Sequence, residues 1–199
     1  MSPDHVVTVD RTGAGATIGS ARLALRPWSV DDAEAALTVY GVDDVARWLS
    51  PAMDRVPDLT SMRSLLEQWI AEVAGLATPQ GRWAVELADT GELVGGVALL
   101  PLPPEGDDLE VAWQLAPHAW GRGLAAEAGQ AVAHHAFTSG VEELFAVVRH
   151  RNTRGAATAQ RVGMEWVGET DKYYDLRLQV YRLRKGDLDA PAVREPATG

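Results

Sequence analysis

The chain has 199 residues, 46% of them hydrophobic, and a net charge of −10, which predicts one globular domain with a real core and argues against a non-specific nucleic-acid binder. Because there is no cysteine, structural disulfides and thiolate metal sites are excluded, and a cytoplasmic location is the expectation. No apolar run has the length of a membrane span, and the first residues lack the basic start and apolar core of a signal peptide.

Hydrophobic periodicity alternates between strand and helix in the first half of the chain. Residues 1–20 are polar and without periodicity, so we expect a flexible tail there. Ser29 is a predicted helix N-cap, because two aspartates follow it in the first turn. The expected elements are a strand over 23–26, helices over 30–40, 43–49 and 58–73, and a hairpin of strands over 82–88 and 92–100.

The second half begins with the stretch around which the domain is organised. Leu109–Leu115 has strand periodicity, a loop with Gly121 and Gly123 follows, and an Ala-rich helix begins at Leu124. The apolar run 145–148 predicts a buried parallel strand. The domain, expected over 21–185, then closes with a helix over 152–162 and antiparallel strands over 164–168 and 176–183, before a second flexible tail over 186–199.

This order of elements predicts an α/β (α+β) domain, in which a mixed sheet carries helices on its faces. The unit over 109–149 should form a right-handed parallel β-α-β crossover. A glycine loop that leads into a helix N-terminus is an anion site, because free N–H groups and the positive end of the helix dipole face the loop. The chain is therefore expected to hold a phosphate-bearing ligand at this loop.

Three phosphate ligands are considered for the loop. A nucleotide P-loop is set aside, because the chain lacks the required Gly-Lys-Ser/Thr tail. A dinucleotide fingerprint G-x-G-x-x-A matches Gly121, Gly123 and Ala126, and Arg149 could meet a ribose phosphate. Against it, the loop lies past the middle of the chain and residues 117–120 separate it from the strand, so the dinucleotide is kept as a minor alternative. The third ligand is the pyrophosphate of coenzyme A.

A resemblance over about residues 20–185 supports the third ligand. The string from His118 to Gly123 resembles the (Q/R)-x-x-G-x-(G/A) motif of the GNAT N-acetyltransferases, with His118 at the Gln/Arg position. Its flanks, E-V-A-W-Q-L-A-P before and L-A-A-E-A after, resemble the RimJ/RimL-like branch in particular. Further matching pieces are residues 23–28, residues 93–96, Asn152 and residues 162–164.

The resemblance implies the GNAT fold, which is a mixed, mostly antiparallel central sheet with helices on both faces and a central parallel β-α-β cofactor unit. It also implies an N-acetyltransferase that moves an acetyl group from acetyl-CoA to a primary amine, on a protein N-terminus or a small molecule. Direct attack is expected, since no cysteine is available for a covalent intermediate. Relatives often dimerise, so a homodimer is one expected state, while no metal, nucleic-acid or membrane partner is expected.

The resemblance places the cofactor at the strand end and the glycine loop. Loop N–H groups would bind the pyrophosphate, and the strand backbone would pair with the pantetheine amides like an added strand. Arg122 could add charge to a phosphate or be a solvated loop cation, and Asn152 could contact the cofactor or be a plain helix cap. The implied cofactor-binding residues are Leu115, Ala116, His118, Trp120, Gly121, Arg122, Gly123, Leu124, Ala125 and Asn152.

Glu110 matches a family glutamate and is the candidate general base, because a partly buried carboxylate with a raised pKa suits an ammonium substrate. Its alternative roles are to position the amine or simply to face solvent. In this branch a serine often assists the leaving thiol, but Gly155 stands at its position. Tyr173 and Tyr174 are therefore the candidate proton donors, with Thr153 a poorer one, and a pocket wall or packing is the alternative for the tyrosines.

Two other classes of function stay open at this point. One is a catalytically silent acyl-CoA-binding or regulatory domain on the same fold, which Gly155 favours. The other is an NAD(P)-binding oxidoreductase, which the G-x-G-x-x-A string favours. No local sequence feature selects the amine acceptor.

Overall fold

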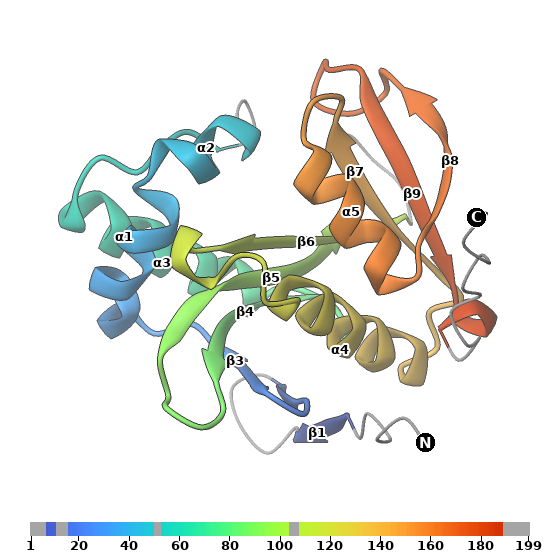
Figure 1. Ribbon diagram of the computed structural model, residues 1–199. Helices are drawn as coiled ribbons and strands as arrows, with labels where there is room; N and C mark the ends of the chain where they lie inside the picture. Colours follow the sequence, from blue (N-terminus) through green and yellow to red (C-terminus); the bar gives the residue numbers. More distant parts are fainter. Residues whose placement is uncertain (1–6, 11–15, 50–52, 104–107, 189–199) are drawn as a thin grey trace, which may run out of the picture.

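A computed structural model describes residues 7–10, 16–49, 53–103 and 108–188 (Figure 1). The helices are α1 (Ala33–Tyr40), α2 (Asp43–Leu49), α3 (Leu59–Val73), α4 (Leu124–Thr138) and α5 (Thr153–Val162). The strands are β1 (Thr8–Asp10), β2 (Thr17–Gly19), β3 (Leu23–Pro27), β4 (Gly81–Leu87), β5 (Leu93–Pro101), β6 (Leu109–Leu115), β7 (Glu143–Arg149), β8 (Glu165–Thr170) and β9 (Leu178–Arg184).

The strands form one sheet in the order β1-β2-β3-β4-β5-β6-β7-β9-β8. β6 and β7 are parallel, and every other neighbouring pair is antiparallel. The parallel pair is joined by α4, as a β-α-β crossover requires. The predicted mixed, mostly antiparallel sheet with one central β-α-β unit is therefore confirmed.

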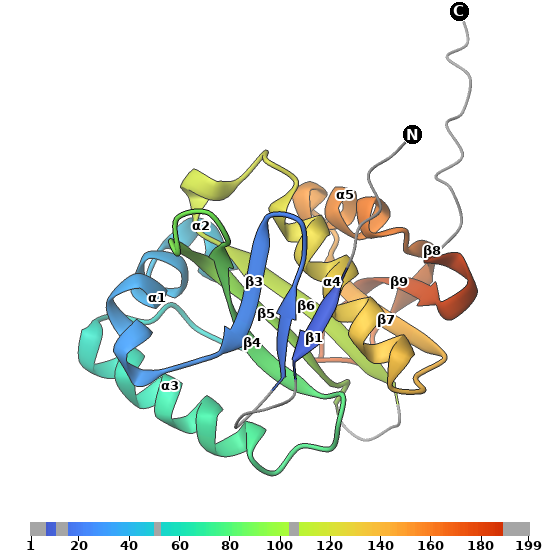
Figure 2. The same cartoon turned by 90° about the horizontal axis from the view of Figure 1, so that it is seen from below.

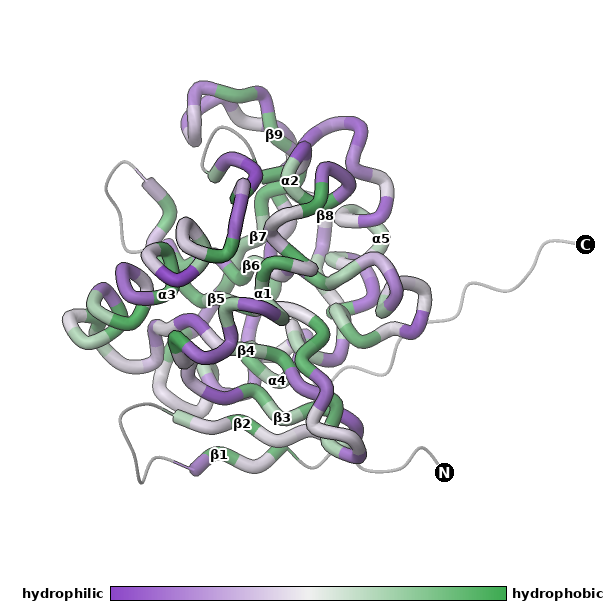
Figure 3. The backbone as a smooth tube through the Cα atoms, turned by 90° about the vertical axis from the view of Figure 1, so that its left-hand side faces the viewer, coloured by the Kyte–Doolittle hydropathy of each residue, from purple (hydrophilic) through white to green (hydrophobic). Residues whose placement is uncertain are grey.

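Side-chain alternation along β4, β5 and β6 divides the core into two layers. Trp83, Val97 and Val111 belong to the cluster under α4, whereas Ala84 belongs to the cluster under α1 and α3. Figures 1 and 2 show α4 on one face of the sheet and α1 and α3 on the other. Hydrophobic residues gather on the central strands and hydrophilic ones on the loops and outer helix turns (Figure 3). This is the strand pattern expected when both faces of a sheet are covered.

The helix ends follow the capping residues in the sequence. The Ser29 side chain accepts a hydrogen bond from the Asp31 N–H, and Asp58 caps α3 by accepting one from the Ser61 N–H at 2.8 Å. α5 ends at Gly163, which has a φ of 106°. The predicted helices are therefore confirmed to within a few residues at their ends.

The N-terminal segment differs from the predicted tail over 1–20. Its described residues form β1 and β2, Ile18 is fully buried, and the Trp83 indole donates a hydrogen bond to the Ala16 carbonyl at 2.7 Å. Three-residue strands are too short to show alternation in a sequence, so periodicity could not detect them. The 3-10 turn Lys185–Asp187 overlaps the start of the predicted C-terminal tail, and residues from 189 on lie outside the described part.

The parallel pair opens soon after it begins. β6 and β7 pair only at Glu110 and Phe145, whereas β6 stays paired to β5 from Leu109 to Leu115. Figure 1 shows β6 and β7 diverging, with α2 and α5 on the two sides of the opening. Alternate residues of β6 therefore direct backbone N–H and C=O groups into the opening rather than to a neighbouring strand.

Candidate active site

The opening between β6 and β7 leads into a cavity of about 1310 Å³. Pockets for one small ligand usually have ~300–1,000 Å³, so this cavity has room for two substrates side by side. One part of its lining comes from the glycine loop and α5, and the other from α2, α3 and β4. Within the described ranges no helix has the length and apolar character needed to cross a bilayer, and no cluster of three metal-ligating side chains forms.

The glycine loop presents backbone to this cavity. Gly121 and Gly123 have φ values of 77° and 76°, in the left-handed region where side chains with a Cβ are strained. Gly123 is the N-cap of α4, so the unpaired N–H groups of the first helical turn lie beside it. A Cβ built on Gly121 would meet no atom within 4 Å, so the space above the loop is open. These features fit a bound pyrophosphate.

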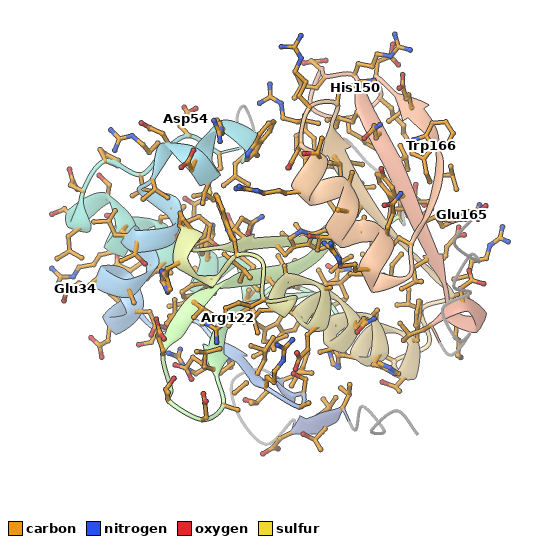
Figure 4. The ribbon with its side chains drawn as sticks, in the orientation of Figure 1. Glu34, Asp54, Arg122, His150, Glu165 and Trp166 are labelled. Atoms are coloured by element: carbon orange, nitrogen blue, oxygen red, sulfur yellow. The ribbon has the colours of Figure 1, made fainter. Side chains whose placement is uncertain are left out.

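A pair of charged side chains fixes the loop from outside. Arg22 pairs with Glu127 at 2.6 Å and donates to the Arg122 carbonyl at 3.0 Å. The same Glu127 carboxylate accepts hydrogen bonds from the Ser20 hydroxyl at 2.9 Å and the Arg22 N–H at 2.8 Å. Across the planar trans peptide the N–H of Gly123 points opposite to the Arg122 carbonyl, and therefore away from the Arg22 guanidinium. Figure 4 shows Arg122 in this loop, just before α4.

Glu127→Gln is expected to raise the KM for acetyl-CoA by about 3- to 10-fold with little change in kcat, since charge-assisted hydrogen bonds are worth ~1.5–3 kcal/mol and Gln keeps only part of them. Initial rates at varied acetyl-CoA measure this. The matched control is Glu165→Gln on β8, which removes a 3.6 Å ion pair with Arg182 of β9, far from the cavity (Figure 4). An equal change in KM for both variants would contradict the role of the Glu127 contacts.

Trp120 connects the glycine loop to α5, which forms the opposite wall of the cavity. Its indole N–H donates to the Leu115 carbonyl at 2.8 Å, and the Arg154 guanidinium on α5 lies 4.3 Å from the centre of its ring. Cation–π contact at this distance holds the N-terminal turn of α5 against the glycine loop. Arg154 therefore brings a positive charge to the same part of the cavity as the loop.

Glu110 lies where β6 and β7 begin to separate. Its carboxylate accepts hydrogen bonds from the Val147 N–H of β7 and from the Tyr174 hydroxyl, the latter at 3.3 Å. Burial raises the pKa of Glu110 from 4.5 to about 7, and the two hydrogen bonds only partly oppose that effect. The carboxylate thus takes the place of a strand partner, and it can hold or release a proton near neutral pH.

Tyr174 reaches Glu110 from the connection between β8 and β9. Its φ of 57° and the 53° of Asp175 place two consecutive non-glycine residues in the left-handed region. Such backbone is uncommon and is found where surrounding structure holds a side chain for a purpose. Burial and the charge of Glu110 raise the pKa of Tyr174 above its usual range, so the hydroxyl stays protonated.

A scan against family models assigns residues 22–165 to a family described as "Acetyltransferase (GNAT) domain". The chain belongs to the GNAT acetyltransferase family. It is similar to the uncharacterized N-acetyltransferase YoaA of Bacillus subtilis, with 27% identity over 154 residues, 76% of this chain and 84% of that protein. The predicted family and the predicted class of enzyme, an acyltransferase, are confirmed.

Solved structures give the same assignment for the fold. An acetyltransferase from Agrobacterium tumefaciens has a TM-score of 0.69 at 28% identity, over 85% of this chain and 94% of that one. Mycobacterium smegmatis RimJ in complex with CoA-disulfide has a TM-score of 0.72 at 23% identity, over 95% of this chain and 91% of that one. The dinucleotide-binding oxidoreductase is wrong, because its doubly wound fold needs a mostly parallel sheet and this sheet has one parallel pair.

Most of the cofactor residues predicted for this GNAT enzyme line the cavity, but two do not. Ala116 is fully buried, and its N–H donates to the Val94 carbonyl at 2.9 Å. His118 points to the β4–β5 hairpin, where its Nε2 lies 3.0 Å from the Glu92 carboxylate. The residues that do line it are Leu115, Trp120, Gly121, Arg122, Gly123, Leu124, Ala125 and Asn152.

Asn152 and Gly155 form one unit at the start of α5. The Asn152 side chain accepts a hydrogen bond from the Gly155 N–H at 2.9 Å, so its role as a helix cap is confirmed. A Cβ at Gly155 would stand 3.0 Å from Asn152 Cγ and 3.1 Å from Val148 Cγ1. A serine side chain therefore has no room at this position unless these neighbouring side chains move.

The tyrosine pair separates into two environments. Tyr173 is buried in a cluster with Leu102 and Leu178, while Tyr174 lines the cavity. Tyr174 is thus the member of the pair placed to act beside Glu110. Two cavity residues, Arg154 and Arg82, were not predicted from the sequence, since a lone arginine on a helix or strand has the same pattern as a solvated surface charge.

Proposed function

We propose that this GNAT enzyme transfers an acetyl group from acetyl-CoA to a primary amine by direct attack, with Glu110 as the general base. The observation that carries the proposal is the position of the Glu110 carboxylate. It lies at the β6–β7 opening, inside the two-substrate cavity, with a pKa raised to about 7. A base with a pKa near the working pH is the most effective acceptor for an ammonium proton.

An ammonium must lose two protons to become an amide. Glu110 takes the first and releases it to solvent, which leaves a neutral amine to attack. As the acceptor nitrogen forms its C–N bond and the thioester C–S bond breaks, Glu110 takes the second proton. Tyr174 donates its hydroxyl proton to the leaving thiolate and regains one from Glu110 through their 3.3 Å hydrogen bond. This proton transfer from Glu110 returns Tyr174 to its neutral form after each turnover. The raised pKa of Tyr174 favours that neutral form.

Acetyl-CoA binding follows from the glycine loop and the free edge of β6. The N–H groups from Gly121 to Ala125 would hold the pyrophosphate, Arg122 and Arg154 would add positive charge, and β6 backbone beyond Glu110 would pair with the pantetheine amides. The likeness to Mycobacterium smegmatis RimJ, whose structure holds CoA-disulfide, supports this placement. We further propose a cytoplasmic enzyme that acts as a homodimer on a small amine or a protein N-terminus.

Thiol release from acetyl-CoA across a panel of small amines and peptides tests the proposal. The expected result is release that depends on the amine, together with the mass of the N-acetylated product. Measurement of acetyl-CoA affinity alongside makes the outcome decisive. Tight binding without release for any amine would overturn the transfer reaction in favour of a catalytically silent acyl-CoA-binding domain.

Tyr174→Phe is expected to lower kcat by about tenfold or more, because the thiolate loses its proton donor. The hydrogen bond from Tyr174 lowers the pKa of Glu110, so its loss raises that pKa and moves the acid limb of the pH–rate profile to higher pH. Tyr173→Phe is the matched control and should leave both kcat and the profile unchanged. A Tyr174→Phe profile that coincides with the wild type would remove Tyr174 from the mechanism.

A further inference from the structure

Arg82 stands on the floor of the cavity in the part not used by the glycine loop. On β4 it is in register with Ala98 of β5, which is in register with Ala112 of β6. Residues in register share a face of the sheet, and Glu110 is two residues from Ala112, so Arg82 and Glu110 project from the same face. The small side chains of Ala98 and Ala112 between them leave open space above the sheet. Neighbouring strands are ~4.8 Å apart and two residues along a strand span ~6.8 Å, so the two side chains start ~12 Å apart across an open floor.

The Arg82 guanidinium is poorly satisfied. Its Nη2 is 3.5 Å from the Glu72 carboxylate, longer than the ~2.7–2.9 Å of a good charge-assisted hydrogen bond. One face of the guanidinium lies over the Trp69 ring at 5.0 Å. The Nε donor is buried and has no hydrogen-bond partner among the described residues. A buried unpaired donor destabilises the protein, and a ligand acceptor reached by a small rotation of the side chain would remove that cost.

Arg26, on the adjacent strand β3, shows what a structural arginine looks like in the same sheet. Its guanidinium donates to both carboxylate oxygens of Asp32, to Glu86 and to the Pro27 carbonyl. These partners raise the pKa of Arg26, whereas burial lowers the pKa of Arg82. The fold thus leaves at Arg82, on the floor of a cavity, a positive charge whose carboxylate partner, Glu72, is held only at 3.5 Å.

The catalytic pair lies within reach of that charge. Arg82 is near enough to Tyr174 for its charge to oppose the rise in the pKa of the tyrosine, and Tyr174 contacts Glu110. Of the other acidic residues that line this side of the cavity, Asp44 is already paired with Arg47 at 2.8 Å, Asp54 is exposed, and Glu72 is 41% exposed. A ligand carboxylate is therefore the partner that would complete the guanidinium, since its two oxygens match adjacent N–H groups of the arginine fork.

We propose that the acetyl acceptor is an amino carboxylate, whose amine lies at Glu110 and whose carboxylate pairs with Arg82. This inference rests on the proposed transfer reaction. The separation of Arg82 and Glu110 favours a chain of a few carbons between the two charged groups, and the low alanine floor accommodates that chain. Trp69 forms the wall beside the carboxylate.

Pairs of acceptors that differ only in charge test the assignment. β-Alanine, γ-aminobutyrate and ε-aminohexanoate are each compared with the corresponding neutral amide. For the preferred length, kcat/KM is expected to be at least about tenfold higher for the carboxylate than for its amide. Arg82→Gln should remove this preference by raising the KM of the carboxylate about 10- to 100-fold, with the amide nearly unaffected. Arg55→Gln, which removes a rim arginine paired with Asp43, is the matched control and should keep the preference.

A second readout does not depend on turnover. Thermal shift of the wild type with CoA and the N-acetylated amino carboxylate is expected to exceed that with the acetylated amide, and Arg82→Gln should abolish the difference while still binding CoA. Equal rates and equal shifts for carboxylate and amide would overturn the Arg82 assignment and leave the transfer reaction intact. Product binding at Arg82 without any acetyl transfer would instead overturn the reaction.

Discussion

Glu110→Gln is expected to lower kcat for acetyl transfer by about 10²- to 10⁴-fold, the usual range for loss of a general base. The glutamine amide is close in shape and can still accept a hydrogen bond from the Val147 N–H. The substitution thus removes proton transfer more than structure. Initial rates at saturating acetyl-CoA and amine measure the loss. Glu143→Gln, at the exposed start of β7, is the control and should leave kcat unchanged.

The pH–rate profile provides a second test of the role of Glu110. Glu110 must be ionised to take a proton, and its pKa in the folded protein is raised to about 7. The wild-type rate should therefore rise as the pH increases through about 7 and then level. Glu110→Gln should lose this inflection. A Glu110→Gln enzyme that keeps wild-type kcat and the same inflection would show that Glu110 is not the base.

Glu110→Gln should lower kcat but raise the free energy of unfolding above about pH 7. The pKa of Glu110 rises from 4.5 to about 7 on folding, so between these values the native state binds more protons than the unfolded chain. The free energy of unfolding of the wild type therefore falls as pH rises through this window. Glu110→Gln escapes that loss and should be more stable than the wild type at pH ~8, by on the order of 1–3 kcal/mol, with little difference at pH ~5. A glutamate that only faced solvent would show neither effect.

The sequence was sufficient where local pattern decides structure. Ser29 and Asn152 cap helices because their side chains satisfy N–H groups a few residues away, which is a short-range property. Glu110 was found because the string around it resembles a family motif. The glycine loop was found because turn, helix start and anion binding are all encoded within a few consecutive residues.

The remaining features depend on contacts between distant segments. Tyr173 and Tyr174 are neighbours in sequence, and only the left-handed backbone at Tyr174 and Asp175 decides which of them reaches the cavity. His118 leaves the loop because Glu92 of the distant β4–β5 hairpin is beside it. Arg82 differs from Arg26 only in which carboxylates the fold brings to it. Such differences are tertiary, and no local propensity carries them.

Gly123→Val is expected to raise the Kd and KM for acetyl-CoA by about 10- to 100-fold or more. A β-branched residue is strongly disfavoured at the φ of 76° found here, so the loop should relax and turn its N–H groups away from the pyrophosphate. Binding of acetyl-CoA by calorimetry and initial rates at varied acetyl-CoA both measure the effect.

Gly91→Val separates loss of the cradle from general backbone strain. Gly91 has nearly the same φ, 71°, in the turn between β4 and β5, and a Cβ there would meet no atom within 4 Å. Both variants should lose about 1–2 kcal/mol of stability from the left-handed conformation, but Gly91→Val should bind acetyl-CoA as the wild type does. If Gly123→Val also kept wild-type affinity, the pyrophosphate would have to lie elsewhere in the cavity, with the cations of α5, Arg154 and Arg161, as its remaining partners.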